Sequence, residues 1–234
     1  MIDFFSQMVR PVLLACGVCA ALTATPAAAQ QIGAAAIARN EVRGSAPARE
    51  IVVGADVYRA ETVRTGGDSQ AKLVFLDDTN ISLGPSSSIV LDRFVYSGDN
   101  SARAVSVNFA KGAFRFATGN SDKKAYELRT PIATIGVRGT VLDIRSETGR
   151  TTVVLVEGAA TVCARKPPPG KQRCRELTSP GDVAVVTASG ASGAPVAPWS
   201  FAETCRNSIG ELCGFTRFAQ AQTTVAAGDV LCGR

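Results

Sequence analysis

Histidine is absent from the 234 residues of this sequence. Its absence removes the commonest general base, proton shuttle and zinc ligand, and it leaves any serine or cysteine nucleophile without its usual activating partner. Serines are plentiful, but none lies in a Gly-x-Ser-x-Gly setting. A carboxylate mechanism would have to use scattered Asp and Glu residues, and the sequence nominates no pair. The sequence therefore favours a protein that is not an enzyme, and it indicates no catalytic residue, cofactor or metal-ligand set.

Charge is also scarce. Charged residues make up 19% of the chain, with 25 basic against 20 acidic side chains and a net charge of +5. This mild excess favours contact with anionic surfaces. It is too small to indicate a nucleic-acid partner, because no Lys/Arg-rich helix or platform of aromatic side chains accompanies it.

Long apolar runs are lacking as well. The run at residues 12–22 follows Arg10 and leads to the small residues Ala27-Ala28-Ala29. This order is typical of a signal peptide cleaved after Ala29, and the run is too short to cross a bilayer. Lipid attachment at Cys16 is a weaker alternative, because only five residues separate it from Arg10. We therefore expect a periplasmic or secreted protein with no transmembrane segment in the mature chain.

Five of the seven cysteines remain after such a cleavage, and an oxidising compartment favours disulfides between them. Cys163 and Cys174 bracket a short Pro-Pro-Pro-Gly loop, and we expect them to be bonded to each other. Closing this loop would stabilise the fold by roughly 2–3 kcal/mol. The pairing of Cys205, Cys213 and Cys232 stays open, with one of them unpaired or joined to another chain.

The same loop carries the densest positive charge in the sequence: Arg165, Lys166, Lys171, Arg173 and Arg175. A solvated hairpin tip is the plainer interpretation. The alternative is a binding surface for an anionic envelope polymer, since a stiffened, clustered set of cations loses little entropy on binding and attracts anions.

Strand-like segments with turn residues between them recur at short spacing over residues 50–189, which predicts an all-β domain of short antiparallel strands. Residues 70–75 alternate in the way typical of a half-buried strand. We expect turns at Lys111-Gly112 and a hairpin through Glu157-Gly158. Residues 30–49 predict a flexible leader, in which residues 32–37 could form a helical turn. Residues 190–234 predict a small cysteine-containing tail, which could include a short helix from Trp199 to Ile209. We expect this tail either to dock on the β-domain or to be tied down by disulfides.

Residues 129–145 are the centre of this organisation. Gly136 and Gly139 flank Val137 and Arg138 within an apolar, β-branched stretch. We interpret the stretch as a crossover between two β-layers. An arginine there needs water or an acceptor, so Arg138 is expected either to pair with a carboxylate such as Asp143 or to contact a ligand.

The cluster Asp77-Asp78-Thr79-Asn80 predicts a turn. Calcium binding is an alternative, but the spacing of ligands in a calcium loop is missing.

Spaced glycine, proline, threonine and arginine positions resemble the FecR domain of bacterial periplasmic sensor proteins over residues 51–186. The matching positions run Val63-Arg64-Thr65-Gly66-x-x-Ser69-x-Ala71-x-Leu73-x-Phe75-x-Asp77, then Leu83-Gly84-Pro85-x-Ser87-x-Ile89-x-Leu91, Gly112-Ala113-x-Arg115, Thr130-Pro131-x-Ala133-Thr134-Ile135-Gly136-Val137-Arg138-Gly139-Thr140 and Val156-Glu157-Gly158. The resemblance implies a β-solenoid-like roll or sandwich of short stacked strands. The best-known members are transmembrane sigma-factor regulators that receive a signal from an outer-membrane siderophore transporter. This sequence differs from them, since a predicted signal peptide stands where they have a cytoplasmic anti-sigma segment and a membrane helix.

Three functions follow as hypotheses. The favoured one is a non-catalytic binding or interaction module of the cell envelope, whose partner is an envelope protein or an anionic envelope polymer. The second is a ligand-sensing partner of a separate signalling system of the sigma-regulator type. The third, least supported, is a carboxylate-dependent cell-wall hydrolase.

Overall fold

The computed structural model describes residues 29–171, 173–194, 199–206 and 212–222. Residues 1–28 of the predicted signal peptide, and Cys232, lie outside these ranges. Within them, no helix is long and apolar enough to span a membrane.

The predicted all-β fold is confirmed. The strands belong to one connected 15-stranded mixed sheet. In chain order the elements are β1 (Gln31–Arg39), β2 (Val42–Ser45), β3 (Ala48–Glu50), β4 (Asp56–Tyr58), β5 (Thr62–Thr65), β6 (Gln70–Phe75), β7 (Asn80–Leu83), β8 (Ser88–Tyr96), β9 (Ala102–Ala117), β10 (Tyr126–Arg129), β11 (Ala133–Glu147), β12 (Arg150–Ala164), β13 (Cys174–Leu177), β14 (Val183–Thr187), β15 (Gly190–Gly193) and the short helix α1 (Ala202–Arg206).

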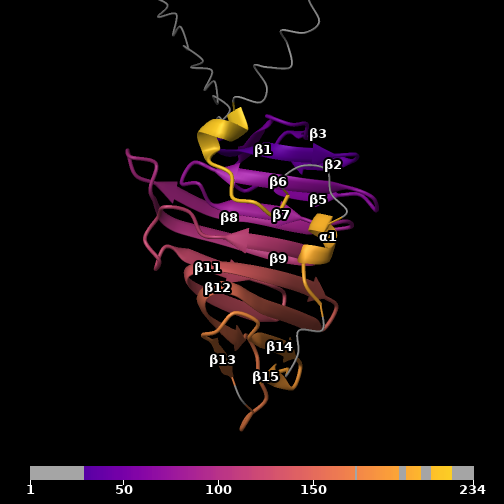
Figure 1. Ribbon diagram of the computed structural model, residues 1–234, viewed down its shortest axis with the longest axis vertical. Coiled ribbons are helices and arrows are strands. Elements are labelled where there is room, and N and C mark those ends of the chain that lie inside the picture. Colours follow the sequence, from indigo (N-terminus) through magenta and orange to yellow (C-terminus); the bar gives the residue numbers. More distant parts are fainter. Residues whose placement is uncertain (1–28, 172, 195–198, 207–211, 223–234) are drawn as a thin grey trace, which may run out of the picture.

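The sheet folds over into two layers because the strands β9, β11 and β12 each belong to both. Layer A consists of β4, β1, β6, β7, the C-terminal halves of β9 and β11, the N-terminal half of β12, β14 and β15. Layer B consists of β3, β2, β5, β8, the N-terminal halves of β9 and β11, β10, the C-terminal half of β12, and β13. The strands stack along the long axis from β1 at one end to β15 at the other (Figure 1).

Each long strand changes partners at a bend. β9 exchanges β8 and β10 for β7 and β11 at Gly112, and β12 exchanges β14 for β13 near Gly158. The predicted turn at Gly112 and the predicted hairpin at Gly158 are therefore wrong, because the strands continue through both points. Gly158 has φ +85°, and a Cβ there would lie 2.0 Å from the carbonyl oxygen of Gly139, so only glycine fits.

The core lies between the layers. Aromatic pairs connect the two: Phe75 of layer A stacks on Phe94 of layer B with ring centroids 4.7 Å apart. Phe114 similarly meets Phe109, and Phe116 meets the edge of Tyr126. Such pairs add roughly 0.5–1.5 kcal/mol each beyond the area that they bury. Packing between aromatic side chains of the two layers therefore stabilises the sandwich form of the fold.

The predicted flexible leader at residues 30–49 is wrong, and so is the helical turn considered for residues 32–37. Residues 31–39 form β1, which pairs with both β4 and β6. Its small residues are required by packing, because a Cβ on Gly33 would lie 2.5 Å from the carbonyl oxygen of Val74. A composition rich in alanine and glycine is typical of a flexible segment, whereas Ala34 and Ala35 are fully buried here.

The tail crosses the outer face of layer A, as predicted from its small size, and Figure 1 shows it returning from the β15 end towards β1. One row of residues lies in direct register across this face: Lys72, Ser82, Arg115, Asp143, Val154 and Val183. Lys72 is fully buried, and its Nζ donates to the Gly214 carbonyl and the Thr216 hydroxyl at 2.6 Å. The expectation of a half-buried strand at residues 70–75 is therefore wrong, because the tail buries the second face as well.

Within the tail a disulfide joins Cys205 and Cys213, a pairing that the sequence left open. The helix α1 of the tail is shorter than the helix expected from Trp199 to Ile209, and residues 207–211 lie outside the described ranges. The predicted end of the β-domain at residue 189 is also corrected, since β15 pairs with β14 through Gly193.

Candidate functional site

The bend in β11 holds the glycine-rich motif around Arg138. Gly139 has φ +62°, and the register of β11 against β12 shifts between Arg138 and Val141. Thr140 fixes this bulge: its hydroxyl donates to the Ala159 carbonyl at 2.7 Å and accepts from the Arg138 backbone N–H at 2.9 Å. Before the bulge β11 pairs with β10, and after it with β9. The predicted crossover is therefore present, and the bulge is what turns the strand from one layer to the other.

Arg138 does not pair with Asp143, which corrects that expectation. Asp143 is fully buried on the outer face of layer A and receives a bidentate pair of hydrogen bonds from Arg115 at 2.7 and 2.9 Å. The backbone N–H of Phe201 in the tail donates to the same carboxylate. Arg138 lies on the outer face of layer B, where its side chain is exposed. The bulge separates the two residues onto different layers.

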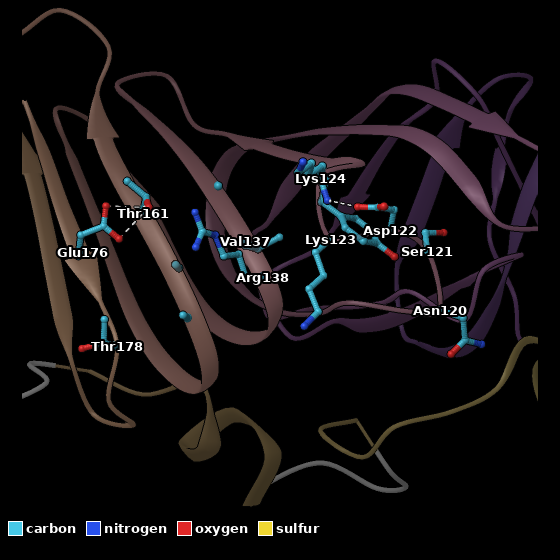
Figure 2. Close-up of a pocket in the computed structure, with 14 residues that line it drawn as sticks. Asn120, Ser121, Asp122, Lys123, Lys124, Val137, Arg138, Thr161, Glu176 and Thr178 are labelled. Atoms are coloured by element: carbon cyan, nitrogen blue, oxygen red, sulfur yellow. Dashed lines mark hydrogen bonds between the residues drawn. The ribbon is translucent and has the colours of Figure 1, made fainter.

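Arg138 borders an open groove of about 1070 Å³ on the outer face of layer B (Figure 2). One wall is the loop that leads into β10, and the other is formed by β12, β13 and the residue after it. The lining consists of Asn120, Ser121, Asp122, Lys123, Lys124, Tyr126, Gly136, Val137, Arg138, Ala159, Ala160, Thr161, Glu176 and Thr178.

Gly136 forms part of the floor of this groove. It lies between Glu127 of β10 and Thr161 of β12 in the ladder. A Cβ built on Gly136 would meet no atom within 4 Å, and its φ lies outside the left-handed region. Neither packing nor conformation requires glycine here, although glycine inside a strand costs roughly 0.5–1 kcal/mol relative to alanine. Gly139 differs, because its positive φ favours glycine.

Two lysines complete the positive charge of the groove. Lys123 and Lys124 belong to the loop before β10, and a Cβ on Gly139 would lie 3.5 Å from the Cε of Lys123. Among the described residues, no ion pair involves Lys123, Lys124 or Arg138. Sequence reasoning did not select these lysines, because only the fold brings residues 123 and 124 beside residue 138. Their adjacency in a polar loop was the one available signal.

The buried carboxylate of Asp77 anchors the lysine loop. Its Oδ2 accepts hydrogen bonds from the hydroxyls of Ser121 at 2.7 Å, Tyr126 at 2.8 Å and Thr79 at 2.9 Å. Burial, followed by the nearby charge of Asp77, raises the pKa of Tyr126 to about 12. The predicted turn at residues 77–80 is thus present, and its carboxylate organises a neighbouring loop. No group of three or more His, Cys, Asp or Glu residues in the described ranges is arranged to hold a metal ion.

The opposite wall carries the carboxylate of Glu176. The Thr161 hydroxyl donates to its two oxygens, at 3.0 and 2.9 Å. Figure 2 shows Arg138 between this pair and the lysine loop. The groove therefore holds three cations, Lys123, Lys124 and Arg138, and two engaged carboxylates, Asp122 in the lysine loop and Glu176 on the opposite wall.

Comparison with known protein families gives a match that includes most of the residues lining this groove. The model of the FecR protein family matches residues 61–161, which include the lysine loop, the β11 bulge and most of β12. Residues 61–161 are thus similar to the FecR protein family. The predicted family resemblance is confirmed over this range.

Solved structures give a more distant likeness. Two crystal structures of a candidate anti-sigma factor from Parabacteroides distasonis align with TM-scores of 0.44 and 0.43, at 14% and 13% identity. Each alignment covers 57% of this chain, which in turn spans only 57% of the length of the other protein. A comparison with curated protein sequences finds no significant match.

The basic loop, defined as Arg165, Lys166, Lys171 and Arg173, lies beyond the matched FecR residues. It connects β12 to β13 and protrudes at the end of the molecule opposite β1 (Figure 1). Its four cationic side chains are exposed. The predicted disulfide closes its base, because Cys163 and Cys174 are direct partners in the ladder with Cα atoms 3.9 Å apart.

Arg175 does not belong to this exposed set, which corrects the five-residue patch. It is partly buried and turns towards β15, where a Cβ on Gly193 would lie 2.6 Å from its Cζ. Its position pairs with Val162, whose side chain points into the core, so the pleat directs Arg175 away from the outer face.

Proposed function

We propose that this chain is an exported, non-catalytic binding module of the bacterial cell envelope, periplasmic or secreted after cleavage near Ala29. Its basic loop contacts an anionic envelope component. The FecR domain supports an envelope role related to signalling, and the signal-peptide pattern of residues 1–29 supports export.

The observation that carries this proposal is the shape of the basic loop. Four exposed cations are gathered on a protruding loop whose base is closed by the Cys163–Cys174 disulfide. Clustering raises the local positive potential, and a closed, proline-stiffened loop loses less conformational entropy when it binds. Association with an anionic polymer should therefore be sensitive to salt.

Co-sedimentation of the purified protein with isolated envelopes tests the proposal. The wild type should pellet at low salt and stay in solution at about 0.5 M salt, where screening acts within a few ångströms. Replacing Lys166, Lys171 and Arg173 by Ser should abolish the low-salt binding. A matched control replaces three exposed cations elsewhere, Arg64, Arg93 and Lys111. Equal binding by the loop variant and the wild type would show that the loop is only a solvated tip.

A second candidate is a ligand-sensing partner of a separate signalling protein, and the FecR match favours it. Such a partner should influence transcription that depends on a sigma factor. Deletion of the gene should then change a defined set of transcripts, and the loop variant should fail to restore them if the basic loop makes the contact. An unchanged transcript profile would remove this candidate.

A cell-wall hydrolase remains the weakest hypothesis. Both carboxylates that line the groove are engaged, since Asp122 accepts from the Lys124 backbone N–H and Glu176 accepts from Thr161. Incubation with purified peptidoglycan should release no soluble fragments. Release that disappears in Glu176→Gln would replace the binding proposal with a catalytic one.

A further inference from the structure

Gly136 is the first observation that points to a second binding site, apart from the basic loop. The space above it is open, its backbone conformation suits any residue, and it lies in the interior of β11. A glycine in a strand that the fold itself does not need often marks the close approach of a ligand or another backbone. A side chain at this position would project from the floor of the groove.

The charges around Gly136 indicate the chemistry of the ligand. Arg138 lies two residues further along the same face of β11, and Lys123 and Lys124 face it from the lysine loop. The loop is held by the buried carboxylate of Asp77, through Ser121 and through the Asn120 backbone N–H, which donates to the Asp77 carbonyl. The cations are thus placed by a rigid support, which lowers the ordering entropy lost on binding. Carboxylates and phosphates are the groups that such a set would pair with.

We propose that the groove between the lysine loop and β13 binds an acidic peptide segment of a partner protein, laid over Gly136. Carboxylates of the peptide contact Arg138 and Lys123, and its backbone or ammonium N–H groups face Glu176 and Thr161. The volume of about 1070 Å³ lies at the upper end of the range of small-molecule sites, so the groove has room for a short peptide segment.

The lining favours a peptide over an anionic glycan. Tyr126 is the one aromatic residue among the lining residues, the residue is only 5% exposed, and its hydroxyl is engaged with Asp77. A sugar ring therefore finds no exposed aromatic face on which to stack.

The test measures fluorescence anisotropy with a labelled Glu-Ala-Glu-Ala-Glu peptide, together with the thermal stability of each variant. Gly136→Val should keep or raise the melting temperature, because valine suits a strand and the space is open. The same change should weaken peptide binding at least tenfold, because the valine side chain would occupy the space over which the peptide is laid. Arg138→Ala should also weaken binding at least tenfold, because each charge-assisted hydrogen bond contributes about that factor. An equal-length peptide with Gln in place of Glu should bind at least tenfold more weakly.

Gly139→Val is the matched control for stability, because its positive φ should make that variant lose stability while Gly136→Val does not. The basic-loop variant should bind the peptide like the wild type, so failure here and failure of the envelope proposal can be told apart. Wild-type binding of the peptide by Gly136→Val, or no measurable binding to the wild type, would overturn the inference. Tighter binding of oligogalacturonate than of the peptide would assign the groove to a glycan instead.

Discussion

At the scale of single residues, three buried carboxylates stabilise structure at separate places. Glu61 pairs with Arg49 beside β2, Asp143 pairs with Arg115 on layer A, and Asp77 holds the lysine loop. Each is almost fully buried and each is engaged. Because a buried charge without a partner is costly, these acids are expected to be far more sensitive to substitution of their partners than the exposed Arg138 is.

The contrast between Arg115 and Arg138 gives a direct prediction. Arg115→Ala should lower the free energy of unfolding by about 3 kcal/mol, because it leaves the fully buried Asp143 without its bidentate partner. Arg138→Ala, on an exposed site, should change it by less than about 0.5 kcal/mol. Urea unfolding measures both. A larger loss for Arg138→Ala would show that its side chain supports the fold.

Tyr126 gives a prediction for alkaline pH. Its pKa in the folded protein, about 12, lies above the ordinary value of 10.0, so the folded state holds this proton more tightly than the unfolded state. The resulting stability is complete below pH 10 and is lost as the pH rises through 12. Tyr126→Phe should be less stable by about 1–2 kcal/mol at neutral pH, and this difference should shrink between pH 10 and 12.

Thermal unfolding of the wild type and Tyr126→Phe across that pH range is the measurement. Burial also raises the pKa of Tyr96, but Tyr96 is present in both proteins and its effect largely cancels. A difference in stability that stays constant from pH 8 to 12 would contradict the raised pKa of Tyr126.

At the scale of elements, the sequence predicts the existence of most strands but not how they connect. Glycine at residues 112 and 158 gives the same local signal for a hairpin turn and for a bend within a continuous strand. Only the partners on either side distinguish the two, and those partners lie far away in the sequence. The flexible leader failed for a related reason, since the burial of Ala34 and Ala35 depends on strands formed later in the chain.

The tail gives the prediction that belongs to this scale. Lys72→Met keeps the length and apolar stem of the side chain but removes the donor to Gly214 and Thr216. The Gly214 carbonyl then loses this hydrogen bond, and docking of residues 212–222 should weaken. Limited trypsin digestion should cut after Arg217 faster than in the wild type. Lys111→Met, which removes an exposed lysine, is the control, and equal rates for Lys72→Met would show that the tail is held by other contacts.

At the scale of the whole molecule, the tail leaves the two layers with unequal outer faces. Tail residues in the ranges 199–206 and 212–222 cover the outer face of layer A at Lys72, Ser82 and Asp143, whereas layer B presents the groove. The basic loop protrudes at the end of the molecule opposite β1 (Figure 1). The sequence predicted Arg138, the loop and its disulfide, because these rest on local spacing. It did not predict that Lys123 and Lys124 lie beside Arg138, or that the space above Gly136 is open, because both depend on which strands become neighbours.

The most direct test of a binding module is NMR titration of the labelled protein with soluble fragments of isolated envelopes. Backbone amide signals of the basic loop should shift at low salt and return at about 0.5 M salt. If the fragments contain acidic peptide, signals around Gly136, Arg138 and Thr161 should shift as well. Shifts absent from both places, or confined to the tail over layer A, would contradict the proposal that this chain binds its envelope partner through the loop and layer B.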